Sequence, residues 1–301
     1  LHPGAYYQPF TRIAEDVQSF SVGTSVLGYI KKDGSFWMAD FNEIYGSKTF
    51  TKMLDNAKTA IINDRNALVL KNDGTVWGWG SDLTGDVFPI DVHSLPSSIL
   101  DDDGWNIFIT RPVQMMSDVQ EIAECYQGSF FLKNDGVLYG IGRADSDLLC
   151  DTKFDNDYGT TTPQKLLDKV KHICTSKRAC YVIREDDSLW GWGKLPWTTQ
   201  KMPLKLADQV KDAVETDSTL AYVTTSGDVW AYGNVLPGCA GNAKSRAKQT
   251  ALTKVDKLFS GIYVNQGLAL RTDGSLWAWG STGMTDSGTD APFYDVYNYS
   301  E

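Results

Sequence analysis

Short apolar runs separated by turn residues recur along the chain, and this pattern predicts strands. The clearest case is the apolar run at 67–70, followed by the turn residues Asn72-Asp73-Gly74 and by a second apolar run at 76–79. Two short apolar runs joined by a glycine-containing turn are typical of a β-hairpin, because glycine tolerates the positive φ that such turns require. The sequence therefore predicts an all-β protein.

The same hairpin recurs six times. An Asp-Gly turn followed by apolar and aromatic residues is clearest at 73–80 and 273–280, and eight of the ten Trp lie inside the six copies. The repeat cores fall near residues 17–40, 57–80, 119–142, 170–193, 210–233 and 255–280. The aromatic residues expected to form the structural core of the repeat are Trp37, Trp77, Trp79, Tyr139, Trp190, Trp192, Trp230, Trp277 and Trp279.

A conserved spacing also links the first aromatic of each copy to an earlier apolar residue, usually a valine, which we call the signature residue. The signature residues are Val17, Ala57, Val119, Val170, Val210 and Val255. The separation is 20 residues in five copies and 22 in the sixth, from Val255 to Trp277. The next signature then follows the aromatic after 20 to 42 residues, so one half of the unit is constant and the other accepts insertions. A packed hairpin joined by surface loops has this property. Prolines, which edge strands tolerate, predict an outer strand shortly before the signature, at Pro9, Pro112, Pro163 and Pro203.

Four short strands in a repeated unit of roughly 40–50 residues describe a β-propeller. We expect one propeller domain over 1–301 with six four-stranded blades, closed by a C-terminal strand at 292–299; seven blades, one of them incomplete, is the alternative. Because side chains alternate along a strand, Trp77 and Trp79 should share one face, with Gly78 on the other. The small residue is expected to make room for stacked neighbouring sheets.

The pattern Leu-x-x-Asp-Gly-x-Val-Trp-x-Trp-Gly, best preserved at 70–80 and 270–280, resembles the regulator of chromosome condensation repeat. The resemblance covers nearly the whole chain and implies a propeller of that superfamily, of a bacterial type. Its members include a nuclear exchange factor for a small GTPase, a plant ultraviolet receptor and a secreted bacterial β-lactamase inhibitor. The resemblance therefore implies a binding module but no particular activity.

Charge and composition exclude several classes of function. The 28 Lys and Arg against 38 Asp and Glu give a net charge of −10, which argues against binding of nucleic acid or an anionic membrane surface. The sequence contains no stretch of 18 apolar residues, so we expect no membrane insertion.

The residues that could carry catalysis or bind a metal are few. The three histidines, of which His172 falls in a predicted strand, suggest no catalytic set. The five cysteines contain no CxxC pair, so we expect no metal or other cofactor. The acidic stretches at 101–104 and 151–157 are interpreted as solvated loops rather than calcium sites, since neither has EF-hand spacing.

The candidate partner-binding residues lie in the insertions and in the turns between the first and second strands. Trp105 and Trp197 are the two Trp outside the repeat, and aromatic residues and Arg dominate the energetics of protein interfaces. The predicted partner-binding residues are Phe88, Trp105, Trp197, Tyr158, Arg65, Tyr126, Arg178 and Tyr263.

These observations predict a non-catalytic, monomeric binding or scaffold propeller that presents loops to a protein or an extracellular polymer. The non-Met start, the tyrosine-rich acidic composition and the resemblance to secreted members favour an extracellular or cell-surface location. One alternative is a guanine-nucleotide exchange regulator of a small GTPase. The other is a carbohydrate-active enzyme, which would need paired carboxylates facing a central pocket.

Overall fold

The chain forms two compact units, which we describe separately. Unit 1 comprises residues 1–81 and 95–117, and unit 2 comprises residues 82–94 and 118–301. The structure is a computed structural model that describes residues 12–23, 26–39, 49–63, 66–81, 87–102, 107–125, 128–143, 147–150, 160–176, 178–216, 219–233, 247–249, 252–260, 266–280 and 294–295.

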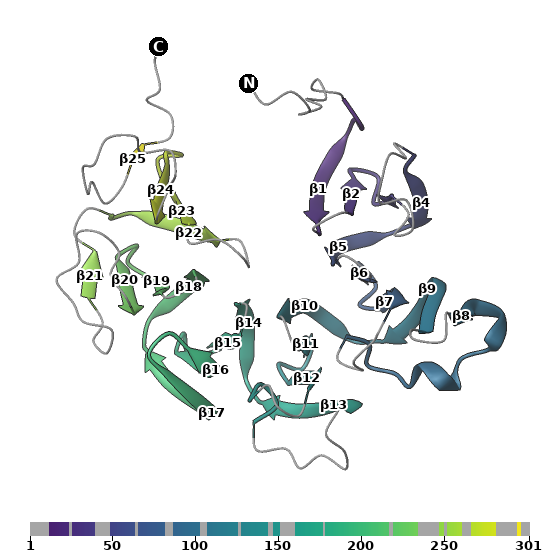
Figure 1. Cartoon of the computed structure of the whole chain (residues 1–301). Coiled ribbons are helices and arrows are strands. Elements are labelled where there is room, and N and C mark those ends of the chain that lie inside the picture. Colours follow the sequence, from purple (N-terminus) through teal and green to yellow (C-terminus); the bar gives the residue numbers. More distant parts are fainter. Residues whose placement is uncertain are drawn as a thin grey trace, which may run out of the picture. The chain divides into compact units, whose positions relative to one another are not determined.

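Unit 1 contains two antiparallel sheets (Figure 1). The first has the order β1-β2-β3-β4, with strands Val17–Val22, Leu27–Lys31, Phe36–Met38 and Thr51–Leu54. The second has the order β5-β6-β7-β9-β8, with strands Ala57–Ile62, Asn66–Lys71, Val76–Ser81, Ile107–Met116 and Leu100–Asp102. A single-turn 3-10 helix, Ser97–Ile99, precedes β8.

Unit 2 contains four sheets of four strands each, in chain order, within its described residues. The third repeat forms β10 (Val119–Cys125), β11 (Gly128–Lys133), β12 (Leu138–Gly142) and β13 (Thr160–Leu167). The fourth forms β14 (Val170–Thr175), β15 (Ala179–Arg184), β16 (Leu189–Leu195) and β17 (Thr198–Ala207). The fifth forms β18 (Val210–Thr216), β19 (Thr219–Thr224), β20 (Val229–Gly233) and β21 (Ala247–Gln249). The sixth forms β22 (Val255–Ser260), β23 (Gln266–Arg271), β24 (Leu276–Gly280) and β25 (Tyr294–Asp295).

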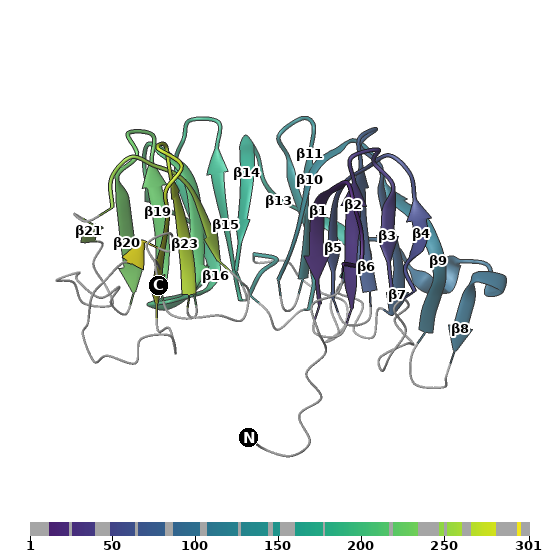
Figure 2. The same ribbon diagram turned by 90° about the horizontal axis from the view of Figure 1, so that it is seen from above.

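The six predicted repeats thus correspond to the six sheets of the described chain, and the prediction of an all-β fold is confirmed. Figure 2 shows the strands of one such sheet, β14 to β16, lying side by side. Pro163 and Pro203 lie in β13 and β17, the outer strands of their sheets, as expected. Pro112 lies in β9, which is between β7 and β8, although β8 pairs with β9 only from Ile107 to Ile109; Pro9 is outside the described residues. In the described parts of the chain, no helix is long and apolar enough to cross a membrane.

The expected closing strand at 292–299 is described only at 294–295. There β25 pairs with Trp277 and Ala278 of β24, so it is the fourth strand of the sixth sheet itself. Closure of the ring by this segment stays a prediction.

One aspartate organises the hairpin turn, and in four of the repeats it does so together with a Ser or Thr hydroxyl and a Trp indole. In the second repeat, Asp73 Oδ1 accepts hydrogen bonds from the Thr75 amide (3.0 Å) and hydroxyl (2.6 Å), and the Trp77 indole donates to that same hydroxyl (2.9 Å). The Lys71 ammonium lies 5.3 Å from the Trp77 ring centroid. Gly74, in the turn, has a φ of 81°, as predicted for the glycine. The Asp–Ser–Trp counterparts are Asp33-Ser35-Trp37, Asp186-Ser188-Trp190 and Asp273-Ser275-Trp277.

These arrangements show that the aspartate shapes the turn. The hydrogen bonds from Thr75 hold the pKa of Asp73 below its usual value, and the serines do the same for the pKa of the equivalent residues Asp33, Asp186 and Asp273.

The two aromatics of the repeat differ in depth. Trp79, Trp192 and Trp279, at the second aromatic position, are buried. The first aromatic is only half-buried in all six repeats: Trp37, Trp77, Tyr139, Trp190, Trp230 and Trp277. The alternation correctly placed both rings on one face, but the second position provides the packed core and the first lies beside its turn.

The second aromatic packs against the preceding sheet. Trp192 contacts Phe130 of the third repeat edge-on, with ring centroids 6.4 Å apart. Trp79 makes the equivalent contact with Phe36 in unit 1, at 5.9 Å. Three apolar clusters in unit 2 follow this scheme, since each joins side chains of two consecutive sheets.

The small residue between the two aromatics is required by side chains of its own sheet. A Cβ added to Gly191 would lie 2.7 Å from the ring of Tyr181 and 2.9 Å from Leu206. Both neighbours belong to β15 and β17 of the same sheet, so crowding within the sheet, rather than the backbone of a neighbouring one, selects glycine.

The signature valine is fixed to the preceding repeat by its backbone. The amides of Val170, Val210 and Val255 donate to the turn carbonyls of Gly136 (2.8 Å), Asp187 (2.8 Å) and Gly227 (3.1 Å). Every residue just before the signature has a positive φ: Asp16, Asn56, Asp118, Lys169, Gln209 and Lys254. A hydrogen bond from one repeat to the next at this point explains why the signature is so regular.

Candidate functional site

The first strands of consecutive sheets in unit 2 lie next to one another, β10 beside β14, β14 beside β18 and β18 beside β22 (Figure 1). On each strand the pairing register shifts just after the signature valine. Such a bulge redirects the side chain that follows it. The residues at this position are all ionisable: Glu121, His172, Asp212 and Lys257.

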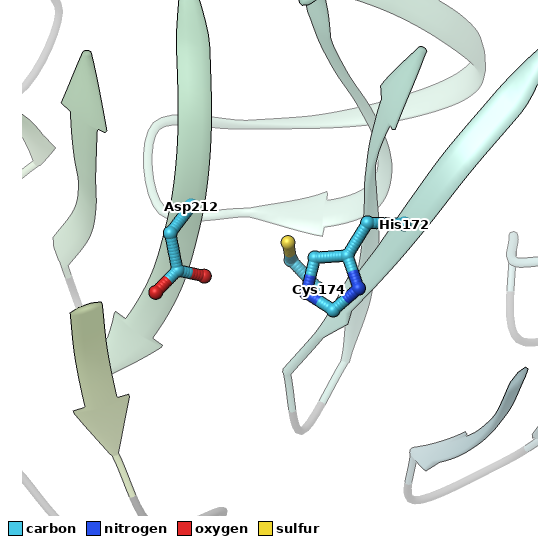
Figure 3. Close-up of side chains that lie close together, drawn as sticks. All are labelled: His172, Cys174 and Asp212. Atoms are coloured by element: carbon cyan, nitrogen blue, oxygen red, sulfur yellow. The ribbon is translucent and has the colours of Figure 1, made fainter. Parts of the chain in front are cut away.

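His172 and Glu121 form the first part of the site. Nδ1 of His172 lies 2.8 Å from Oε1 of Glu121, and the other carboxylate oxygen accepts a hydrogen bond from the Ile173 amide (3.2 Å). The carboxylate therefore holds the imidazole in one orientation. Figure 3 shows the other side of the ring directed towards Cys174 and Asp212.

Asp212 comes from the next sheet and is 8% exposed. Its two oxygens accept hydrogen bonds from the amides of Ala213 (2.9 Å) and Leu258 (2.8 Å). Burial raises the pKa of Asp212, and the Leu258 amide opposes that effect. The two backbone amides fix the direction of the carboxylate.

Burial and hydrogen bonds set the electrostatics of the Cys174–His172 pair. Burial raises the pKa of the Cys174 thiol, which therefore keeps its proton at neutral pH. Hydrogen bonds to Cys174 and Glu121 raise the pKa of His172 to about 11.

The three side chains form a set of potential metal-ligand atoms. One imidazole nitrogen, the Cys174 sulfur and one Asp212 oxygen all lie within 4.8 Å of one another. We call His172, Cys174 and Asp212 the donor cluster. Sequence reasoning interpreted His172 as an ordinary surface residue and missed the cluster, because Asp212 comes from another sheet. The available signal was the ionisable residue two positions after the signature valine in four consecutive repeats.

The predicted partner-binding residues are scattered. Phe88 has no exposed surface, so its side chain cannot contact a partner, and including it was wrong. Trp197 is half-buried and packs on Tyr232 with ring centroids 4.7 Å apart, beside the core between the fourth and fifth sheets. Arg178 is exposed. The remaining five lie outside the described residues and stay predictions: Arg65, Trp105, Tyr126, Tyr158 and Tyr263.

A different exposed surface lies on β1. Phe20 is 73% exposed, Val22 63% and Val17 37%. We call these three residues the β1 face. At the position of Phe20, the last four repeats carry side chains no more than 6% exposed: Ile122, Ile173, Ala213 and Leu258. At the position of Val17, the other five signature residues are at most 3% exposed. Within the described residues of unit 1, the β1 face is therefore exposed at two repeat positions, those of Phe20 and Val17, that later blades bury.

The fold is that of a β-propeller, whose blades are the sheets described above. It is similar to human WBSCR16 (TM-score 0.68, 19% identity, covering 88% of this chain and 76% of that one). It is also similar to yeast RCC1 (Prp20) in a structure bound to Kap60 (TM-score 0.67, 16% identity, 92% and 74% covered). A third similar structure is Prp20p from Saccharomyces cerevisiae, described with its binding to Gsp1p and histones (TM-score 0.63, 17% identity, 87% and 71% covered).

No family model and no curated protein matches the sequence. The structural likeness confirms the β-propeller fold that the repeat predicts. At these identities it shows the fold alone.

Proposed function

We propose that the chain is a non-catalytic propeller that binds a protein partner, and that the β1 face is the surface it uses. The observation that carries the proposal is the exposure of Phe20 at a repeat position that is buried in four other blades. Exposed apolar residues gathered on one element are typical of interaction surfaces. The sequence pointed to loops, whereas the described chain offers a strand face.

The chemistry of this face favours a protein over an extracellular polymer. Phe20 and Val22 present apolar surface, and Val17 extends it along the same strand. In four other blades the residue at the position of Phe20 is buried, and in all five the residue at the position of Val17 is buried. A partner that presents an apolar sheet face would bury the same side chains in the same way.

Exchange activity on a small GTPase is the second candidate. It is supported by the likeness to Prp20p, whose structure is described with binding to Gsp1p, and the identity of 17% does not carry the activity over. Purified chain added to a small GTPase loaded with fluorescent nucleotide would accelerate nucleotide release if this function were present. An unchanged rate of nucleotide release would exclude exchange activity on that GTPase, and partner binding would remain the proposed function.

Placement at the cell surface or outside the cell is also a proposal. The described cysteines, Cys125, Cys150, Cys174 and Cys180, form no disulfide with one another, a state typical of reducing compartments. Fractionation of cells that express the tagged full-length gene distinguishes a location at or outside the cell surface from one in a reducing compartment.

A photo-crosslinking amino acid placed at residue 20 tests the binding surface in the native cell. The matched control carries the same amino acid at Lys205, which is exposed on β17, far from β1 in sequence. We expect one heavier adduct from position 20 and none from position 205. Equal adducts from both positions, or none from either, would overturn the proposal, and an adduct containing only this chain would show that the partner is a second copy.

A further inference from the structure

We propose that the donor cluster, His172, Cys174 and Asp212, binds one divalent transition-metal ion, and that zinc is the ion it fits best. The inference is independent of the β1 face and of any partner. It rests on three donor atoms of different chemistry that two consecutive sheets bring within 4.8 Å of one another. Figure 3 shows the three side chains converging from β14 and β18.

The spacing is close to what a tetrahedral ion needs. Zinc binds nitrogen and oxygen at about 2.0–2.2 Å and sulfur at about 2.3 Å, which places neighbouring ligand atoms about 3.5 Å apart. The three donors therefore need to move together by about an ångström at most, a distance that small side-chain rotations supply. Three protein ligands leave the fourth position to water, as in open zinc sites.

The surroundings of the cluster resemble those of a metal site. A metal-binding histidine usually donates its second ring N–H to a carboxylate, which fixes the ring and raises the basicity of the ligating nitrogen. Glu121 is placed for this role, 2.8 Å from Nδ1 of His172. The amides of Ala213 and Leu258 orient the Asp212 carboxylate from outside the cluster. Each Asp212 oxygen accepts one amide and retains a further lone pair for a metal.

The cluster reaches solvent through its histidine. The His172 side chain is 43% exposed, whereas Cys174 and Asp212 are buried. An ion can therefore enter past the imidazole and meet the sulfur and the carboxylate behind it.

The donor types select the metal. A thiolate and an imidazole suit zinc and cobalt, whereas calcium and magnesium prefer oxygen ligands alone. The structure thus assigns a transition-metal site where the sequence suggested no metal, because the sequence offered no CxxC pair and its histidines seemed isolated.

Calorimetric titration of the untagged, metal-free protein with zinc chloride, and separately with calcium chloride, tests the proposal. We expect one zinc per chain and no heat with calcium. Addition of cobalt(II) should give a thiolate-to-cobalt charge-transfer band in the near ultraviolet, which only sulfur coordination produces.

Three variants locate the site. Cys174→Ser should abolish the cobalt charge-transfer band, whereas Cys150→Ser, the matched cysteine control outside the cluster, should keep it. Glu121→Gln should weaken zinc binding by about 10–100-fold and still show the band, because Glu121 positions His172 without touching the metal. Circular dichroism of each metal-free variant shows whether it is folded before titration.

Two results would overturn the assignment. The first is the absence of zinc binding in the folded wild-type chain. The second is binding that survives Cys174→Ser and Asp212→Asn with unchanged affinity. If Cys174→Ser does not fold, Asp212→Asn and the cobalt spectrum of the wild type still decide the matter.

Discussion

Trp190 and Trp192 lie two residues apart on β16 and should contribute very differently to stability. Trp192 is fully buried, donates from its indole to the Leu148 carbonyl (2.6 Å) and contacts Phe130 edge-on. Replacing Trp192 by alanine removes the ring and opens a cavity between two sheets, which should lower the free energy of unfolding by about 3–5 kcal/mol.

Trp190 is half-buried at the edge of the apolar cluster between the third and fourth sheets, and its polar contacts lie within its own hairpin. Its indole donates to the Ser188 hydroxyl (2.8 Å), and the Arg184 guanidinium lies 5.3 Å from the ring centroid. A partly exposed cation–π contact contributes about 0.5–1 kcal/mol and the hydrogen bond about 1 kcal/mol, so Trp190→Ala should cost about 2 kcal/mol.

Urea unfolding of the two variants, followed by far-ultraviolet circular dichroism, measures the difference. Trp192→Phe is the intermediate case, because it keeps most of the apolar ring and loses the hydrogen bond to Leu148, at an expected cost of about 1–3 kcal/mol. If Trp190→Ala lowered the unfolding midpoint as much as Trp192→Ala, the assignment of the packed core to the second aromatic would be refuted.

Three further predictions concern the backbone and the turns. Lys169 has a φ of 57°, so Lys169→Gly should relieve left-handed strain and raise stability by about 0.5–1 kcal/mol; a lower thermal midpoint would contradict this. Gly191→Ala should destabilise by about 1–3 kcal/mol in urea unfolding, because the new Cβ meets the Tyr181 ring at 2.7 Å; an unchanged midpoint would show that this ring moves aside. Hydrogen bonds from Ser or Thr lower the pKa values of the turn aspartates in the folded chain. Their contribution to the free energy of unfolding is therefore present above about pH 4 and is lost as the pH falls through the folded pKa. Stability measured from pH 5 to pH 2 should therefore fall less steeply in Asp186→Asn than in the wild type, and parallel curves would exclude this role.

The hairpins could be predicted from sequence because their determinants are local. Gly74 adopts the positive φ that the Asp-Gly turn requires, and Pro203 lies in β17, the outer strand of its sheet, as a proline should. Both features depend on a few neighbouring residues. The six sheets followed from repetition of this local signal.

Burial depth and the donor cluster could not be predicted in the same way. Alternation assigns Trp190 and Trp192 to one face, but only the packing of the preceding sheet decides which ring is buried. Phe88 looked like an exposed loop aromatic and is fully buried. His172 and Asp212 lie 40 residues apart in the chain, and their proximity exists only once two sheets are stacked.

Thiol labelling tests the central claim most directly, namely that Phe20 is exposed at a repeat position that four other blades bury. Phe20→Cys and Ile173→Cys place a thiol at the same repeat position, once on β1 and once on β14, in an otherwise identical chain. Labelling under native conditions should modify Cys at position 20 rapidly and at position 173 only on unfolding, with the wild-type chain as the background. Equal protection of the two positions would mean that the β1 face is already covered in the isolated chain, and would contradict the binding surface proposed for it.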